Sequence, residues 1–235
     1  MPVKVAINGF GRIGRNILRA IIESDRSDIE VIAINDLGSV ATNAHLLQYD
    51  SVHGRFPVKI NHSETSLNAG RGDIRVTALR NPADLPWQDV DVALECTGVF
   101  TDREKAAIHL DNGATRVLVS APSKGADKTI VYGVNHTEIS AEDRVISNAS
   151  CTTNCLAPLA KVIHDNFGTS LVRRSTPGMV WSSSEIGIRW VRASILVRLG
   201  RGNKTAILSS GKRGRFHRNR HTQHGGHELR PSTLC

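Results

Sequence analysis

A cysteine that could act as a nucleophile lies in the hexapeptide Ser-Cys-Thr-Thr-Asn-Cys at residues 150–155. Residues 145–148, Val-Ile-Ser-Asn, are typical of a strand, and the apolar residues of 156–163 favour a helix. Ser150 is suited to cap that helix, which places Cys151 in its first turn. Free backbone N–H groups and the helix dipole favour a thiolate there. Cys151 is therefore a candidate nucleophile. The alternative is that Cys151 and Cys155 are two small buried residues one turn apart.

A second pattern at the start of the chain points to a dinucleotide. Residues 9–14 read Gly-Phe-Gly-Arg-Ile-Gly; they follow an apolar strand at 3–7 and precede a segment with apolar residues at helical spacing. The first glycine permits a tight turn, the second lets the backbone approach a pyrophosphate, and the third lets helix and strand pack closely. The pyrophosphate would rest on the amino terminus of the helix. The expected cofactor-binding residues of this turn are Gly9, Phe10, Gly11, Arg12, Ile13 and Gly14.

An acidic residue stands where such a site requires one. A second expected strand at 29–34 leads to Asp36, about twenty residues past the last glycine, where a carboxylate binds ribose hydroxyls. A carboxylate facing the 2′ position repels the phosphate of NADP, so the cofactor is predicted to be NAD. The alternative is that Asp36 is an ordinary turn aspartate.

Strands and helices alternate further along the chain. Segments 76–80, 90–96 and 116–120 favour strands, and 105–112 favours a helix. This order predicts an α/β fold with a doubly wound parallel sheet, the Rossmann arrangement. Ligands of such sheets bind at the carboxyl ends of the strands, where Arg80, Thr97 and Ser120 fall.

Several segments together resemble the family of phosphorylating, NAD-dependent glyceraldehyde-3-phosphate dehydrogenases. The resemblance runs in family order from residue 2 to about residue 168. Besides the hexapeptide and the glycine turn, it is carried by residues 33–36 (Ala-Ile-Asn-Asp), 49–54 (Tyr-Asp-Ser-Val-His-Gly), 95–98 (Glu-Cys-Thr-Gly) and 119–123 (Val-Ser-Ala-Pro-Ser).

The resemblance implies an activity and roles for residues. Cys151 would attack the aldehyde, hydride would pass to NAD, and inorganic phosphate would cleave the thioester to an acyl phosphate, in glycolysis or carbon fixation. It assigns Arg80 and Ser120 to NAD contacts with Thr97 nearby, and Ser150 and Thr152 to the substrate site. The family is homotetrameric. Erythrose-4-phosphate dehydrogenase is the nearest enzymatic alternative, but it tends to carry Glu where this chain has Asp36.

The composition changes abruptly after residue 168. Residues 1–168 carry 17 Lys and Arg against 20 Asp and Glu, a net charge of −3, whereas 169–235 carry 13 against 2, a net charge of +11. The tail contains neither Asp nor Tyr and has the character of a frameshifted translation. The family's catalytic histidine, which holds the cysteine as thiolate and relays protons, would fall close to Gly178, and no histidine occurs between His164 and His217.

These observations predict three parts: an NAD-binding domain at 1–150, the opening helix of an incomplete α+β catalytic domain at 151–168, and a basic, irregular tail at 169–235. The chain is expected to be a very weak or inactive dehydrogenase. A noncatalytic protein that binds NAD, or that contacts nucleic acid nonspecifically through the tail, is the alternative from another class. His217, His221, His224 and His227 are not expected to bind a metal, because Gly225 and Gly226 interrupt any helix.

Four cysteines in 235 residues, with two of them one turn apart, do not suggest a disulfide framework, and a reactive thiolate requires a reducing compartment. The apolar runs are too short for a membrane span, and the amino terminus leads into a strand rather than a signal peptide. A cytoplasmic protein without membrane contact is therefore expected.

Overall fold

The computed structural model describes residues 1–167, 169–171, 194–199 and 204–209. Its main feature is a sheet in the order β10-β11-β9-β8-β1-β2-β7-β6-β5. Every pairing from β10 to β7 is parallel, as predicted. The parallel strands are β1 (Val3–Asn8), β2 (Ile29–Asn35), β7 (Asp73–Thr77), β8 (Val92–Glu95), β9 (Arg116–Val119), β10 (Lys128–Thr129) and β11 (Val145–Ser147).

Both faces of this sheet are buried, because neighbouring residues of β1 pack into different cores. Val5 and Ile7 pack with Leu18 and other apolar residues in one cluster. Ala6 belongs to a second cluster, which contains Trp87 and Ala106. A strand buried on both sides is characteristic of parallel sheets covered by helices, so the sequence-based fold class is confirmed.

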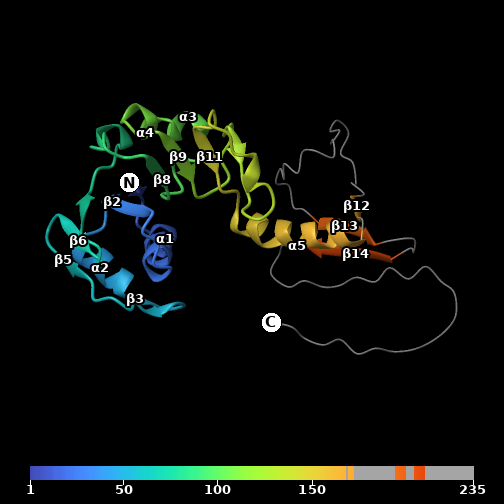
Figure 1. Cartoon of the computed structure of the whole chain (residues 1–235), viewed down its shortest axis with the longest axis horizontal. Helices are drawn as coiled ribbons and strands as arrows, with labels where there is room; N and C mark the ends of the chain where they lie inside the picture. The colour runs from blue at the N-terminus through green and yellow to red at the C-terminus, as the bar shows by residue number, and fades with distance from the viewer. Residues whose placement is uncertain (168, 172–193, 200–203, 210–235) are drawn as a thin grey trace. The chain divides into compact units, whose positions relative to one another are not determined.

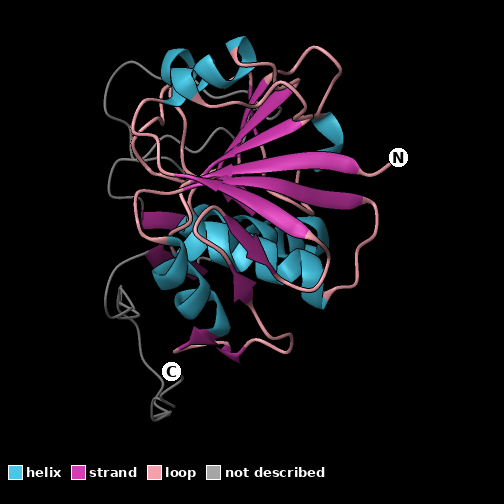
Figure 2. Ribbon diagram, turned by 90° about the vertical axis from the view of Figure 1, so that its left-hand side faces the viewer, coloured by secondary structure: helices cyan, strands magenta, loops and turns pink. Residues whose placement is uncertain are grey.

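The helices explain the two cores. α1 (Arg12–Glu23) contributes Leu18, and α2 (Val40–Gln48) contributes Leu47, to the first cluster. α3 (Arg103–Ala106) and α4 (Ile108–Asp111) border the second cluster through Ala106 and Leu110. Figure 2 shows helices above and below the fanned strands. The doubly wound arrangement therefore follows from side chains on both faces of the strands.

Two of the predicted elements have bounds in the structure that differ from those expected from the sequence. The strand predicted at 76–80 lies earlier in the sequence, at β7. Its last pairing hydrogen bond is the one that the Asp36 N–H donates to the Thr77 carbonyl. The strand ends there because the Leu79 N–H donates to the side-chain oxygen of Asn35, at 2.8 Å, and not to a neighbouring strand. Arg80 consequently lies beyond the strand in an exposed loop. The helix predicted at 105–112 forms as two short helices, α3 and α4, which join at Ala107.

Smaller elements complete the first part of the chain. β5 (Asn61–His62) and β6 (Ser66–Asn68) extend the sheet in antiparallel fashion beside β7. β3 (Tyr49–Asp50) and β4 (Gly54–Arg55) form a separate two-stranded pair. Two 3₁₀ turns lie at Pro82–Asp84 and His136–Glu138.

The chain divides into two compact units, Met1–Lys161 and Val162–Cys235, and the division falls inside α5 (Cys151–Phe167). The second unit contains an antiparallel sheet of β12 (Thr169–Leu171), β13 (Ser194–Leu199) and β14 (Lys204–Ser209), labelled in Figure 1. The expectation of an irregular tail is wrong for these segments. β13 and β14 each contain two β-branched residues, a type that favours strands. The boundaries predicted after residues 150 and 168 stay predictions.

The remaining tail features of the sequence analysis, including the position near Gly178 and the four histidines at 217–227, lie outside the described residues. Within the described part of the chain, no helix has the length and apolar character needed to cross a membrane.

Candidate functional site

The three glycines of the turn after β1 have the three environments that the motif predicts. Gly9 has a φ of +90°, and a side-chain carbon there would lie 2.7 Å from the Thr97 amide nitrogen. At Gly14, such a carbon would lie 2.3 Å from the Gly9 carbonyl oxygen. At Gly11, it would meet nothing within 4 Å. The first and third glycines are therefore required by packing, whereas the second faces open space that a ligand can approach.

The glycine turn leads directly into α1. Gly11 caps this helix without any side-chain hydrogen bond to its first turn. Backbone N–H groups of a first turn that lack such a cap are suited to bind an anion. Phe10 is fully buried and anchors the turn, while the side chain of Ile13 is half exposed. The turn can therefore hold a pyrophosphate.

Asp36 lies beside the glycine turn, as the sequence predicts. Its Oδ2 accepts the backbone N–H of Phe10 at 2.8 Å, which ties the end of β2 to the turn after β1. Its Oδ1 accepts the backbone N–H of Gly38 at 2.8 Å and the Asn43 side chain at 3.2 Å. Asp36 is partly exposed, so it can also accept from a ligand hydroxyl. It acts first as a brace of the turn, a role that the sequence analysis did not foresee.

Arg12 fixes a neighbouring loop. Its Nη1 lies 3.0 Å from Oδ2 of Asp50, which belongs to the Tyr-Asp-Ser-Val-His-Gly segment. The backbone N–H groups of His53 and Val52 also donate to Asp50, at 2.9 and 2.8 Å. These hydrogen bonds, with the Arg12 guanidinium, hold the pKa of the Asp50 carboxyl well below its usual range. Arg12 is thus tied to this loop on the side of α1 that carries the glycine turn.

A buried polar ladder runs beneath the carboxyl ends of the strands. The Asn35 side chain donates to Asn8 Oδ1 at 2.8 Å, and the Asn8 side chain donates to Glu95 Oε2 at 2.7 Å. Nε2 of His109 lies 2.9 Å from the same carboxylate oxygen, and both side chains are almost fully buried. The other oxygen, Oε1, accepts the backbone N–H of Thr97 at 2.9 Å and also the Thr97 hydroxyl. The ladder fixes the turn at Thr97 against which Gly9 packs.

This ladder was not predicted from the sequence. The segment that contains Glu95 contributed only to the family resemblance, and nothing in the sequence paired it with His109. A polar residue at the end of an otherwise apolar strand is the signal that could have found Asn8 and Asn35.

Ser120 and Cys96 lie near each other after β9 and β8. The Ser120 amide donates to the Glu95 carbonyl at 3.0 Å, and its side chain hydrogen-bonds Cys96. Burial raises the pKa of the Cys96 thiol to about 11, because desolvation disfavours the thiolate. Cys96 is therefore a packed thiol, as expected, and is not suited to nucleophilic chemistry at neutral pH.

Cys151 is the first residue of α5, and its side chain is exposed. Ser150 caps the helix: its Oγ accepts the backbone N–H of Thr153 at 3.0 Å. Ser150 Oγ also lies 3.0 Å from the Thr152 hydroxyl. The predicted capping by Ser150 and the position of Cys151 in the first turn are therefore observed. The structure brings Ser150, Cys151 and Thr152 together as consecutive residues around the amino terminus of one helix.

The predicted site residues follow the carboxyl ends of parallel strands, along one edge of the sheet. Gly9, Asp36, Thr97, Ser120 and Cys151 follow the carboxyl ends of β1, β2, β8, β9 and β11. These strands are parallel neighbours in the order β11-β9-β8-β1-β2. The strands that precede Asp36 and Cys151, β2 and β11, are thus about 19 Å apart in the sheet, at about 4.8 Å per strand. Arg80 follows the carboxyl end of β7, the parallel strand beside β2, by three residues.

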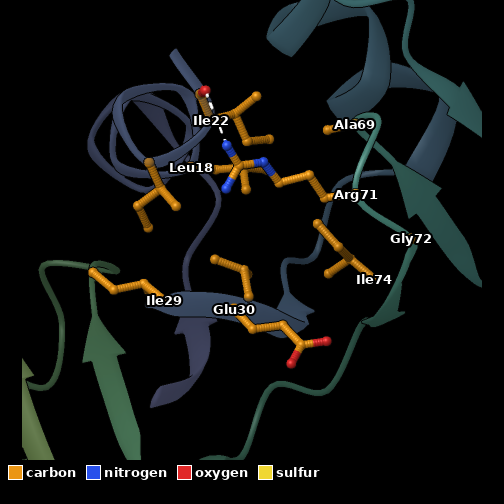
Figure 3. A pocket seen from close by; sticks show the side chains of 10 residues that line it. Leu18, Ile22, Ile29, Glu30, Ala69, Arg71, Gly72 and Ile74 are labelled. Carbon is orange, nitrogen blue, oxygen red and sulfur yellow. Dashed lines mark hydrogen bonds between the residues drawn. The ribbon is translucent and has the colours of Figure 1, made fainter. Parts of the chain in front are cut away.

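A small apolar pocket lies away from this edge. It is lined by Leu18, Ile22 and Ile29 among others, and Arg71 reaches over it from beside β7 (Figure 3). Nη2 of Arg71 lies 2.8 Å from Asp25 Oδ1 and 3.5 Å from the Ile22 carbonyl oxygen. None of the predicted site residues lines this pocket, so it is separate from the candidate site.

Two segments of the chain match models of one protein family. Residues 3–103 match the family described as "Glyceraldehyde 3-phosphate dehydrogenase, NAD binding domain", and residues 150–181 match the family's C-terminal domain. The chain belongs to the glyceraldehyde-3-phosphate dehydrogenase family. The glycine turn and Asp36 fall in the match to the NAD-binding domain, and Cys151 falls in the match to the C-terminal domain.

Similar curated proteins carry the same name. Glyceraldehyde-3-phosphate dehydrogenase of Cereibacter sphaeroides is 69% identical over 168 residues, which are 72% of this chain and 50% of the relative. That of Xanthobacter flavus is 67% identical over 170 residues, 72% of this chain and 51% of the relative. That of Thermotoga maritima is 53% identical over 167 residues, 70% of this chain and 50% of the relative.

The chain spans about half the length of these glyceraldehyde-3-phosphate dehydrogenases. The match to the C-terminal domain runs to residue 181. This family match extends beyond residue 168, where the resemblance is expected to end, whereas the alignments to the three relatives cover 167 to 170 residues.

Proposed function

We propose that this chain binds NAD along the carboxyl edge of its parallel sheet and presents Cys151 as the nucleophile of an aldehyde-phosphate dehydrogenase. One observation carries the proposal: Asp36, the glycine turn and Cys151 follow strands of the same parallel sheet. An extended ligand on that edge would pass from Asp36 over the glycine turn toward Cys151.

The residues at the edge fit NAD. The open space at Gly11 and the absence of a side-chain cap on α1 suit a pyrophosphate, while Asp36 can accept from ribose hydroxyls. Ile13, Leu37 and Val99 have exposed apolar side chains shortly after the ends of β1, β2 and β8. Apolar contacts beside a few placed polar groups are typical of a cofactor site. When bound, NAD supplies the hydride acceptor of the reaction.

The chemistry of Cys151 follows from its place on α5. Its sulfur would form a bond to the carbonyl carbon of an aldehyde phosphate, giving a thiohemiacetal. Hydride would pass from that carbon to bound NAD, and loss of the hydroxyl proton would then leave a thioester. Inorganic phosphate would displace the Cys151 thiolate from the thioester and form an acyl phosphate. Ser150 and Thr152, on either side of Cys151, present hydroxyls that could contact the substrate. Arg80 and Ser120 are proposed NAD contacts, with Thr97 beside them.

Several finer points belong to the same proposal. The chain would act in glycolysis or carbon fixation, in the cytoplasm, where a reducing environment preserves a thiolate. We do not propose the family's homotetramer for this chain, because the part that matches its relatives spans about half of their length. The frameshift hypothesis for the tail continues to explain the change in composition, and the net charge of +11 would permit nonspecific, salt-sensitive contact with nucleic acid.

Two measurements on the full chain test the proposal. Calorimetry should detect binding of NAD, and mass-resolved labelling with iodoacetamide should modify Cys151 faster than Cys155 or Cys96. Cys155 is the internal control, because it is also exposed but lies one turn further along α5. No binding of NAD, or labelling of Cys151 no faster than that of Cys155, would contradict the proposal. Salt-sensitive binding of nucleic acid without binding of NAD would favour the noncatalytic alternative.

A further inference from the structure

The turn between β11 and α5 has an unusual backbone. Ala149 stands directly before the cap residue Ser150 and has a φ of +55°, a region that residues other than glycine rarely adopt. Its side chain is 5% exposed and packs in a small cluster with Val131 and Ala157. A buried alanine holds such a conformation only where its surroundings impose it. The question is which groups impose it.

Asn154 hydrogen-bonds to both sides of this turn. Its Nδ2 donates to the Asn148 carbonyl oxygen at 2.7 Å and to the Ser150 carbonyl oxygen at 3.0 Å. Those two carbonyls belong to the residues that flank Ala149. The Asn154 side chain therefore forms a bridge from the first turn of α5 back to the residue after β11, across Ala149.

The strand side of the turn has anchors of its own. The Asn148 amide donates to the Val119 carbonyl at 2.9 Å, and the Ala149 amide donates to Ser147 Oγ at 3.1 Å. These bonds hold the residues before the helix to the sheet. The bridge by Asn154 transmits that placement to the helix end on which Cys151 stands.

Pro158 increases the importance of the bridge. Proline has no N–H group, so it cannot donate the helical hydrogen bond to the carbonyl of Asn154, four residues earlier. The first turn of α5 thus lacks one of its ordinary backbone restraints. Side-chain bonds from Asn154 compensate by fixing that turn to the preceding strand.

We propose that Asn154 is a positioning residue for Cys151. By bridging the carbonyls of Asn148 and Ser150, it fixes the turn at Ala149 and so sets where the Cys151 sulfur lies relative to the N–H groups of the α5 first turn. It does not touch the reacting atoms. The inference rests on the proposed role of Cys151 as a nucleophile and adds the residue that holds it in place.

Asn166 offers a matched control on the same helix. Its Nδ2 donates to the Val162 carbonyl, four residues earlier, at 2.8 Å, just as Asn154 donates to Ser150. It is distant in sequence from Ala149 and Cys151. Asn154→Ala and Asn166→Ala therefore remove the same kind of side chain and the same kind of helical bond, and alanine has the higher helix propensity at both positions. The two variants differ in the bond to Asn148.

The experiment is competitive labelling of the full chain with iodoacetamide at several pH values, read as the ratio of Cys151 to Cys155 modification. Asn154→Ala should lower that ratio about two- to fivefold, the range that corresponds to misplacing a charge from a helix amino terminus. Asn166→Ala should leave the ratio as in the unmodified chain. The serine side chain of Asn154→Ser is too short to span both carbonyls, so this variant should lower the ratio in the same way. It replaces the alanine variant in the experiment if that variant does not fold.

The outcomes test the nucleophilic role of Cys151 and the positioning role of Asn154 separately. A Cys151 to Cys155 ratio near one in the unmodified chain contradicts the nucleophile itself. A high ratio that stays high in folded Asn154→Ala or Asn154→Ser overturns the positioning role while leaving the nucleophile intact. An equal loss in Asn166→Ala also overturns it, because the effect would then belong to the helix as a whole.

Discussion

Nε2 of His109 lies 2.9 Å from Oε2 of Glu95, and neither side chain reaches solvent. The same carboxylate accepts the Asn8 side chain and, through Oε1, the backbone N–H of Thr97. One buried acid thus links β1, β8 and α4 below the edge at which the candidate cofactor site lies. The Trp87 ring stacks on His109 with centroids 4.9 Å apart, which closes the network from the side of the second core.

Glu95→Ala should be strongly destabilising. It leaves the donors of Asn8, Thr97 and His109 buried without an acceptor, at about 1–3 kcal/mol for each unsatisfied group. We expect the free energy of unfolding to fall by more than about 3 kcal/mol in urea titrations followed by circular dichroism. Glu30→Ala is the control, because Glu30 is an exposed glutamate on β2 and its loss should change stability by no more than about 0.5 kcal/mol. Similar midpoints for the two variants would contradict a structural role for the ladder.

Gly14→Ala should mainly lower the stability of the fold, whereas Gly11→Ala should mainly lower the affinity for NAD. A methyl group at Gly14 would collide with the Gly9 carbonyl, so this variant should lose about 1–3 kcal/mol of stability. A methyl group at Gly11 meets no protein atom but projects into the space proposed for the pyrophosphate. That variant should lose less than about 1 kcal/mol of stability. Its affinity for NAD should nevertheless fall about tenfold or more, as the loss of a hydrogen bond to a charged group would produce.

Thermal unfolding and calorimetry with NAD, applied to both variants, check this pair. Unaltered binding of NAD by Gly11→Ala would show that the cofactor does not approach the backbone at that glycine. An equally stable Gly14→Ala would contradict the close packing of α1 on the glycine turn.

Asp36→Asn should narrow the preference for NAD over NADP. The neutral amide removes the repulsion of a 2′ phosphate and weakens hydrogen bonding to the ribose, so the difference in binding free energy should shrink by roughly 1–3 kcal/mol. Asp28→Asn is the matched control: Asp28 precedes β2, whereas Asp36 follows it. Calorimetry with both cofactors measures the effect. Equal affinity of the unmodified chain for NAD and NADP would refute the assignment of Asp36.

Much of this arrangement could be predicted from sequence, for identifiable reasons. The glycine turn and Asp36 could be placed because their spacing is fixed by one βαβ unit, and the capping of α5 by Ser150 depends on adjacent residues. The ladder from Asn35 to His109 could not be predicted, since its longest link, from Asn8 to Glu95, joins residues 87 positions apart whose pairing depends on the strand order. The predicted bounds of this strand, 76–80, were wrong because the Leu79 N–H donates to the side-chain oxygen of Asn35 and not to a neighbouring strand.

The loop at Asp50 should contribute to acid sensitivity. The pKa of this carboxyl is lowered in the folded chain by the backbone N–H groups of His53 and Val52 and by Arg12. Between the lowered pKa and the ordinary value, the unfolded chain binds the proton and the folded chain does not, so stability falls as pH falls. The contribution of Asp50 is complete above about pH 4 and is lost as the pH drops through the lowered pKa.

Asp50→Asn removes this titration. The stability difference between the unmodified chain and Asp50→Asn should therefore be largest near neutral pH and should narrow on acidification, as measured by urea midpoints at a series of pH values. A difference that stays constant down to the lowest pH at which the chain is folded would mean that Asp50 is not held ionised by these contacts.

The chain should be a very poor dehydrogenase even if it binds NAD and Cys151 is reactive. The catalytic histidine implied by the family has no counterpart near Gly178, and general base catalysis typically contributes about 10²–10⁴-fold. The family's substrate-positioning groups also have no recognisable counterparts in residues 169–235, which lowers the expected rate further. Turnover of glyceraldehyde-3-phosphate with NAD and phosphate should lie at least about a thousandfold below that of a full-length relative assayed in parallel.

Restoring the reading frame across the codons for residues 167–170 should recover a histidine-containing strand and ordinary turnover. Ordinary turnover by the unaltered chain would mean instead that the residues after α5 build a working active site, and the frameshift hypothesis would have to be abandoned.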